Sequence, residues 1–323
     1  MADAADHRAV ARVLRSAPSV VIGSHVDPDG DAVGSCLGLA RALDRARIPC
    51  EVVLASGLSV PTTYAFLPGA DRFRDPATVA APAVFVALDS PELRRLGAAE
   101  DLARSASTIV MIDHHPDAVP EGHVNVFDST AAATGCLVWE LLAHLDVTAD
   151  AEIASCLYTA LLTDTGRFSY SNTTPDALRT AAAMVEAGAD PSGLFVATYE
   201  NRSAAAQRLI GLTLERITPV NGGLVAYSWV TAEDFASTGA LPEEAENLID
   251  HVRALRGVDV VLLAKTDGKT VKGSLRAKTD TDVGAVARRF GGGGHRAAAG
   301  FTFAGDLDSL LAEMLPHLPG GGR

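Results

Sequence analysis

The stretch GSHVDPDGDAVGS at residues 23–35 decides the fold. Apolar residues lead into it from Ser19, which predicts a strand that ends at His25, and a helical pattern leaves it from about Asp31 to Arg45. The same alternation continues along the chain, with further apolar runs at residues 50–56, 83–90 and 107–115. Strands that alternate with helices are typical of an α/β fold, with a mostly parallel sheet and helices on both faces.

Acidic and histidine side chains crowd into the turn after the first strand. His25, Asp27, Asp29 and Asp31 lie close together in the sequence. Carboxylates this close repel one another unless a multivalent cation neutralises them. Open α/β sheets bind their ligands beyond the carboxyl ends of the strands, which is where this turn lies. The turn therefore predicts a metal site.

Two later strands and one helix end in the same kinds of residue. The apolar runs stop at Asp89 and at Asp113, which His114 and His115 follow, and Asp164 ends an apolar helix. An aspartate at a helix C-terminus opposes the helix dipole, so a nearby cation would compensate it. Each site has an ordinary alternative, such as a solvated turn, a calcium loop or a helix cap. Because the pattern recurs at successive strand ends, one shared metal centre is favoured.

The chain is long enough for two domains. Helices are predicted at about 130–145, 150–163 and 175–187, and the stretch AGADPSG at 187–193 has the composition of a linker. Beyond it, the sequence predicts a smaller α/β unit with a helix at 207–214, strands at 223–230, 258–266 and 270–278, and helices at 282–290 and 307–315.

Glycine and basic residues give the second unit a candidate anion site. In FGGGGHRAAAG at 290–300, four glycines let backbone N–H groups approach a phosphate, with His295 and Arg296 beside them. A flexible linker is the alternative for the glycines. Arg276 lies in a predicted strand, where it could equally be an ordinary surface residue, although a guanidinium is well shaped for bidentate phosphate binding.

These segments resemble the motifs of DHH/DHHA1 phosphoesterases. HVDPDGDAVGS, ALDS, the literal DHH at 113–115 and LLTDTGRF resemble the four motifs of the DHH domain, and VKGSLRAK and GGGGH resemble those of DHHA1. The resemblance covers nearly the whole chain. It implies a catalytic DHH domain at 1–188, a linker or hinge at 189–206 and a substrate-binding DHHA1 domain at 207–323.

The resemblance also implies roles for individual residues. Asp89 would bridge two divalent metals, Asp113 would orient a histidine, and His115 would face the substrate phosphate; Asp27 stands at a variable motif position and is not expected to be a ligand. The six implied metal ligands are His25, Asp29, Asp31, Asp89, His114 and Asp164, and His114, His115, Asp113 and Asp89 form the implied catalytic group. The implied substrate contacts are Ser274, Arg276, Gly292, Gly293, Gly294, His295 and Arg296. Two imidazoles with four carboxylates suit Mn²⁺ better than Mg²⁺, and Co²⁺ or Mg²⁺ could substitute.

The bulk properties restrict the partners. A formal net charge of -13 disfavours binding of long nucleic acid. The four cysteines form no C-x-x-C pair, and neither a signal sequence nor an apolar run of membrane-spanning length is present. We therefore expect a cytoplasmic protein with reduced cysteines and no membrane association. A homodimer is expected from the family and from the prevalence of such assemblies.

The resemblance implies hydrolysis of small nucleotides to mononucleotides. Very short oligoribonucleotides, 3′-phosphoadenosine 5′-phosphate (pAp), linear pApA and cyclic di-AMP all offer a suitable phosphoester. A family II inorganic pyrophosphatase is the nearest alternative, but it would carry a Ser-Arg-Lys-Lys type cluster where this chain has GSLRAK and GGGGHR. A RecJ-like exonuclease is disfavoured by chain length and charge. A non-catalytic nucleotide-binding module is the alternative from another class, and it would show degenerate metal ligands.

Overall fold

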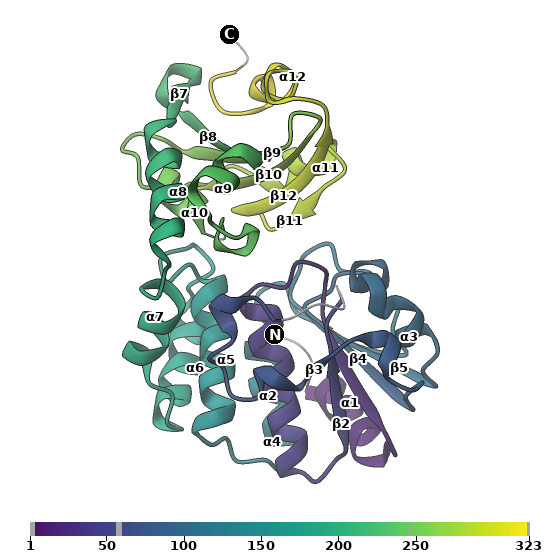
Figure 1. Ribbon diagram of the computed structural model, residues 1–323. Coiled ribbons are helices and arrows are strands. Elements are labelled where there is room, and N and C mark those ends of the chain that lie inside the picture. Colours follow the sequence, from purple (N-terminus) through teal and green to yellow (C-terminus); the bar gives the residue numbers. More distant parts are fainter. Residues whose placement is uncertain (1–3, 56–59, 246, 322–323) are drawn as a thin grey trace. The chain divides into compact units, whose positions relative to one another are not determined.

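The computed structural model describes residues 4–55, 60–245 and 247–321. The chain divides into two compact units, Met1–Glu200 and Asn201–Arg323 (Figure 1). Among the described residues, we find no helix with the length and apolar character needed to cross a membrane.

The first unit is built on a six-stranded sheet with the order β3-β2-β1-β4-β5-β6, in which every neighbouring pair is parallel. Every residue of β1 and β4 is buried, as expected for strands covered on both faces. The strands are β1 (Val20–Gly23), β2 (Cys50–Val53), β3 (Phe73–Arg74), β4 (Val84–Leu88), β5 (Thr108–Asp113) and β6 (Val124–Phe127). The predicted α/β fold is confirmed, although the run predicted to end at residue 56 reaches beyond the described residues.

Helices cover both faces of this sheet (Figure 1). Val20 and Ile22 face the larger core, whereas Val21 and Phe85 face a smaller core on the opposite side. The helices are α1 (Ala4–Ser16), α2 (Gly30–Arg45), α3 (Glu100–Arg104), α4 (Thr134–His144), α5 (Ala151–Asp164), α6 (Pro175–Glu186) and α7 (Pro191–Tyr199), and the 3₁₀ helices are η1 (Thr62–Tyr64), η2 (Ala70–Arg72), η3 (Pro76–Thr78) and η4 (Leu93–Ala99).

Three glycines bring α2 against α5 in antiparallel contact. A Cβ atom added at Gly30 would lie 2.4 Å from Thr163 Oγ1, and one added at Gly34 would lie 2.5 Å from the Cys156 carbonyl oxygen. A Cβ atom added at Gly38 would lie 2.4 Å from Leu157 Cδ2. Because no side chain separates the helices, the N-terminus of α2 lies beside the C-terminus of α5.

The segment predicted as a linker or hinge at 189–206 contains α7 and the first residues of the helix that begins at Ala204. The side chain of Asp190 caps α7 by accepting from the Ser192 N–H, and Pro191 occupies the first turn. Leu194 and Tyr199 are buried in the core of the first unit. The D-P-S-G sequence therefore starts a helix, because aspartate and proline are favoured at these positions. The division between units falls after Glu200.

The second unit is a smaller α/β structure with a mixed sheet of order β11-β12-β10-β9-β8-β7. Only β8 and β9 pair in parallel among its described strands. The strands are β7 (Thr218–Val220), β8 (Val225–Thr231), β9 (Val260–Thr266), β10 (Thr270–Ala277), β11 (Gly293–Gly294) and β12 (Ala298–Ala304). The helices are α8 (Ala204–Glu215), α9 (Ala232–Thr238), α10 (Leu248–Arg253), α11 (Val283–Arg289) and α12 (Leu307–Met314), with 3₁₀ helices η5 (Asn221–Gly223), η6 (Pro242–Ala245) and η7 (Leu315–His317).

Candidate metal centre

The carboxyl edge of the first sheet gathers all eight residues predicted for the metal and catalytic groups of the first unit. His25 and Asp29 follow β1, Asp89 follows β4, and β5 ends at Asp113. Asp164 ends α5, which the α2 glycines hold beside the start of α2. The remaining members of the set are Asp31, His114 and His115, and the contacts that join these eight residues are described below.

Asp29 and Asp31 are both fixed by helix N-termini. Asp29 caps α2, where its Oδ1 accepts from the N–H groups of Asp31 at 3.0 Å and Ala32 at 3.1 Å. Asp31 accepts from the N–H groups of Thr134 at 2.7 Å and Gly135 at 2.9 Å, at the start of α4. Backbone donors at a helix N-terminus favour a carboxylate. These contacts hold both side chains in a single orientation.

Asp31 is nevertheless a poor site for an unaccompanied negative charge. Its side chain is 1% exposed. Burial, followed by the negative charge of Asp89, raises the pKa of Asp31 well above its usual range. A buried carboxylate next to other carboxylates stays ionised only with a positive charge nearby. A cation next to Asp31 would therefore stabilise its ionised form.

Asp89 lies between two imidazoles. Its φ of 52° is in the left-handed region, which non-glycine residues seldom occupy outside constrained sites. Asp89 Oδ2 lies 3.4 Å from His25 Nε2, and Oδ1 lies 3.5 Å from His114 Nε2. The Thr134 hydroxyl donates to Oδ1 at 3.0 Å. Burial raises the pKa of Asp89, but the hydrogen bond with His25 and the surrounding imidazoles outweigh burial and hold it below its usual range.

Both imidazoles present Nε2 to the carboxylates. His25 Nδ1 lies 2.7 Å from the Val26 carbonyl oxygen, and His114 Nδ1 lies 3.2 Å from that of Ala131. Because a carbonyl only accepts, Nδ1 carries a proton in each ring, and Nε2 is the ring atom that faces the carboxylates. A positive charge must then lie between nitrogen and oxygen. It can be a proton: burial lowers the pKa of His25, but Asp89 outweighs burial and raises it to about 9. It can equally be a metal cation.

The spacing of the donor atoms fits divalent cations. His114 Nε2 faces one oxygen each of Asp31 at 3.5 Å, Asp89 at 3.5 Å and Asp164 at 3.7 Å. These distances are long for hydrogen bonds, and one proton cannot serve three carboxylates at once. Two sets of donor atoms each lie within 4.8 Å of one another: Asp31, His114 and Asp164, and His25, Asp29 and Asp89. Imidazole nitrogens with carboxylate oxygens are ligands that first-row divalent metals accept.

Asp113 and His115 form a hydrogen-bonded pair next to this donor set, and His115 Nδ1 lies 3.6 Å from Asp89 Oδ1. Asp113 is fully buried, and its Oδ1 accepts from His115 Nδ1 at 2.7 Å and from the His114 N–H at 2.8 Å. Burial lowers the pKa of His115, but the hydrogen bond to Asp113, together with the negative charges of Asp113, Asp89 and Asp164, outweighs burial and raises the pKa to about 10. Asp113 thus fixes the orientation of His115, whose side chain is 20% exposed.

Three polar residues that the sequence analysis did not name support the ligands. Thr134 contacts both Asp31 and Asp89, as described above. The Ser35 hydroxyl donates to Asp31 Oδ1 at 2.9 Å, and the Asn172 amide donates to Asp164 Oδ2 at 3.3 Å and to the Ala132 carbonyl at 3.0 Å. Ser35 lies within the quoted 23–35 stretch, but Thr134 and Asn172 carry no signal that distinguishes them from other polar residues.

The predicted substrate contacts of the second unit lie on its sheet and the adjoining turn. Ser274 and Arg276 point to the same face of β10, because they are two residues apart in a strand. The glycine stretch is partly a strand and not wholly a loop, since Gly293 and Gly294 form β11 and Gly292 precedes it. His295 follows β11. The Arg296 guanidinium donates to the Asp280 carbonyl at 2.8 Å.

Comparison with known proteins identifies the family. Residues 19–161 match the N-terminal domain of the DHH family, and residues 221–316 match the DHHA1 domain. The chain is 35% identical over 311 residues to the bifunctional oligoribonuclease and PAP phosphatase NrnA of Thermus thermophilus, covering 95% of this chain and 92% of that protein. The chain belongs to the DHH family. As a DHH-family protein with these relatives, it is a hydrolase that acts on phosphoric ester bonds.

A further relative agrees with this chain in length, and a solved structure agrees with it in fold. NrnA of Bacillus subtilis is 25% identical, covering 94% of this chain and 96% of that protein. The crystal structure of an exopolyphosphatase-related protein from Bacteroides fragilis superposes with a TM-score of 0.86 at 24% identity, covering 97% of this DHH-family chain and 95% of the other. That similarity confirms the fold.

Proposed function

We propose that this chain is a manganese-dependent phosphoesterase that hydrolyses short oligoribonucleotides and pAp to mononucleotides. The main observation in support is that one carboxylate oxygen of Asp89 faces His25 and the other faces His114. Asp89 therefore lies between two sets of donor atoms. The names of the Thermus and Bacillus relatives support the substrate class. Linear pApA and cyclic di-AMP present the same kind of bond and belong among the candidate substrates.

The six donor residues would hold two cations. His25 and Asp29 would bind one, Asp31, His114 and Asp164 the other, and Asp89 would contribute to both. Two such cations, when bound, supply Lewis acidity that activates water and neutralises phosphoryl oxygens. The mixed nitrogen and oxygen donor set favours Mn²⁺ over Mg²⁺, and Co²⁺ would be tolerated.

The chain's own residues position the substrate in this proposal. His115, which Asp113 holds in place, donates a hydrogen bond to the phosphate and adds positive charge beside it. In the second unit, the backbone of Gly292, Gly293 and Gly294 and the side chains of Ser274, Arg276, His295 and Arg296 remain the proposed substrate contacts. A planar guanidinium such as that of Arg276 binds phosphate oxygens in bidentate fashion.

Hydrolysis by chelator-stripped protein reloaded with Mn²⁺, Mg²⁺ or Co²⁺ tests the proposal. The substrates are pAp, pApA, di- to pentaribonucleotides, cyclic di-AMP and pyrophosphate. We expect Mn²⁺ to give the highest rates, and Asp89→Asn to lower kcat/KM by about 1,000-fold, equivalent to about 4 kcal/mol of lost transition-state stabilisation. The exposed Asp101→Asn on α3 is the matched control and should retain wild-type rates.

Two results would contradict the proposal. Wild-type rates in Asp89→Asn would exclude the metal centre, and turnover of pyrophosphate above every nucleotide would favour the pyrophosphatase alternative. Calorimetric titration with Mn²⁺ provides a readout that is independent of activity: wild type should bind Mn²⁺ tightly and Asp89→Asn weakly. Tight nucleotide binding without product would instead favour the non-catalytic module.

A further inference from the structure

Asp164 is the candidate metal ligand that lies at a helix C-terminus. Asp29 and Asp31 accept hydrogen bonds from N–H groups at helix N-termini, whereas Asp164 ends α5. The dipole of a helix disfavours a carboxylate at this end, where carbonyl groups and not N–H groups are left over. The Asp164 side chain is also 22% exposed, compared with 1% for that of Asp31. A contact from another part of the chain is therefore needed to fix it.

Asn172 makes such a contact. Its Nδ2 donates to Asp164 Oδ2 at 3.3 Å, to the Asp164 carbonyl at 3.1 Å and to the Ala132 carbonyl at 3.0 Å. Because carbonyl and carboxylate oxygens accept hydrogen bonds, the nitrogen of the amide must face all three, and this sets the orientation of the side chain. The amide oxygen is buried and has no hydrogen bond among the described residues. The side-chain hydrogen bonds of Asn172 are thus donated by Nδ2.

Through Asn172, Asp164 is joined to the segment at 131–135 that also holds other candidate ligands. The Ala131 carbonyl lies 3.2 Å from the Nδ1 atom of one imidazole, and the Thr134 N–H and hydroxyl each donate to a carboxylate. The candidate ligands held in this way are His114, Asp31 and Asp89. Since Asn172 bonds to a carbonyl of the same segment, Asp164 is held against the same frame as these three.

A strained turn returns the chain from Asp164 to Asn172. Gly166, Arg167 and Phe168 have consecutive φ values of 54°, 63° and 59°, and two of them are not glycine. Left-handed backbone at bulky residues persists where the surroundings enforce it, and such strain clusters at functional sites. The turn is tight enough for Asn172 to contact Asp164 although only eight residues separate them.

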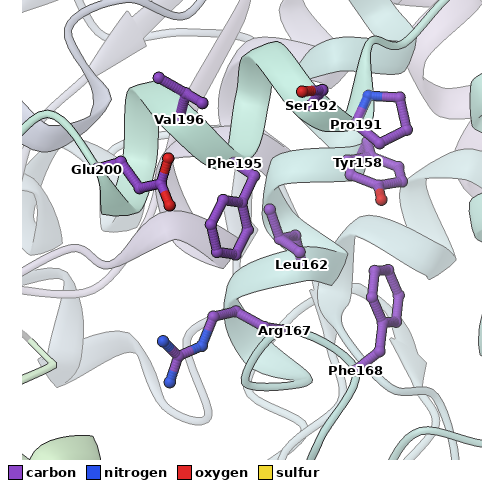
Figure 2. Close-up of a pocket in the computed structure, with 9 residues that line it drawn as sticks. All are labelled: Tyr158, Leu162, Arg167, Phe168, Pro191, Ser192, Phe195, Val196 and Glu200. Atoms are coloured by element: carbon purple, nitrogen blue, oxygen red, sulfur yellow. The ribbon is translucent and has the colours of Figure 1, made fainter.

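The turn is anchored on the face of α5 opposite Asp164. The Phe168 ring has its centroid 5.9 Å from that of Tyr158 on α5. Tyr158, Leu162 and Phe168 line one side of a cavity between α5 and α7 (Figure 2). Leu162 and Asp164 are two residues apart in a helix, so their side chains point about 200° apart around its axis. The turn therefore wraps around the end of α5, with its anchor on one face and the Asn172 contact on the other.

We propose that Asn172 is a positioning residue that fixes Asp164 among the donor atoms, and that the strained turn serves to place it there. The inference rests on the proposed metal centre and adds a residue to it. Asp164 belongs to only one of the two sets of donor atoms. Loss of the Asn172 amide should therefore weaken the binding of one cation and spare the other.

Asn172→Leu tests the proposal, because leucine has the same branched shape but no hydrogen-bond donor. Calorimetric titration of the chelator-stripped protein with Mn²⁺ should resolve two binding events in the wild type. One of them should be about 10- to 100-fold weaker in Asn172→Leu, the range typical when an outer partner of a metal ligand is lost. The kcat for pAp should return to near the wild-type value once the Mn²⁺ concentration fills the weakened site, because Asp164 itself is retained.

Asn125→Leu is the matched control. Asn125 is also partly buried in the first unit, but its Nδ2 donates to the Gly122 carbonyl at 2.9 Å and its Oδ1 accepts from the Gly122 N–H at 3.0 Å. These hydrogen bonds lie within one short stretch of chain and involve no candidate ligand. Urea unfolding should show a loss of stability in Asn125→Leu, whereas both Mn²⁺ binding events should keep their wild-type affinity.

Failure of this inference is distinguishable from failure of the proposed function. Wild-type affinity for both cations in Asn172→Leu, or equal weakening of both events, would overturn the role of Asn172 and leave the metal centre in place. The same weakening in Asn125→Leu, or a kcat that stays low at saturating Mn²⁺, would overturn it as well. If the wild type itself binds no Mn²⁺, the proposed metal centre fails, and the inference fails with it.

Discussion

Removing the Thr134 hydroxyl should weaken metal binding without disturbing the fold. This hydroxyl donates to Asp89 Oδ1 at 3.0 Å, and both side chains are buried. Thr134→Val retains the shape of the side chain and the backbone N–H that holds Asp31. A buried hydrogen bond to a charged group contributes about 1.5–3 kcal/mol, which corresponds to about 10- to 150-fold in affinity. Loss of an outer partner of a metal ligand typically costs a similar factor, about 10- to 100-fold.

A matched control separates this effect from general destabilisation. Thr159 is also fully buried in the first unit, but its hydroxyl donates to the Ser155 carbonyl at 2.9 Å, within α5. Calorimetric titration of the chelator-stripped proteins with Mn²⁺ should show weakened binding in Thr134→Val and wild-type affinity in Thr159→Val. Urea unfolding of the stripped proteins should show small losses in both. Equal Mn²⁺ affinity in the two variants would refute the assignment of Thr134 as a positioning residue for Asp89.

Three further predictions concern stability and assembly. Gly34→Ala should destabilise the first unit by about 1–3 kcal/mol in urea unfolding, because the new Cβ would lie 2.5 Å from a backbone oxygen of α5. Gly211→Ala in α8 is the control: its new Cβ would meet nothing within 4 Å, and it should stabilise the second unit by about 0.5–1 kcal/mol. Asp234→Asn should cost about 1–2 kcal/mol at pH 7, because Asp234 accepts from Arg216 and completes the capping box of α9. Its hydrogen bonds with Arg216 hold the pKa of Asp234 below the usual value, so the difference in stability from wild type should be full above about pH 4 and should close as the pH falls through the folded pKa. Sedimentation equilibrium should give about twice the chain mass of 33.5 kDa if the expected homodimer forms, and a mass of one chain would refute it.

The sheet and the grouping of the candidate donor residues were predictable because their signals are local. The strands β1, β4 and β5 are continuous apolar runs, and each leads directly to a histidine or an aspartate. Parallel strands carry such residues to the same edge of the sheet, so the grouping of His25, Asp89 and His114 followed from their positions alone.

The missed features depend on tertiary context. Thr134 gains its role from contacts with Asp31 and Asp89, which lie 103 and 45 residues away in the sequence. The α7 segment begins with turn residues that are also typical of a linker. Only its packing against the core of the first unit distinguishes a helix from a linker there. Helix α1 carries Val10 and Leu14 at helical spacing, a local signal that the prediction left unused.

The proposed metal ligands come from positions as far apart as His25 and Asp164. A nascent chain therefore leaves the ribosome with an incomplete set of ligands until α5 has been synthesised and has docked against the α2 glycines. Under the proposed function, metal would therefore bind only after the first unit has folded, and it could not guide the early steps of folding.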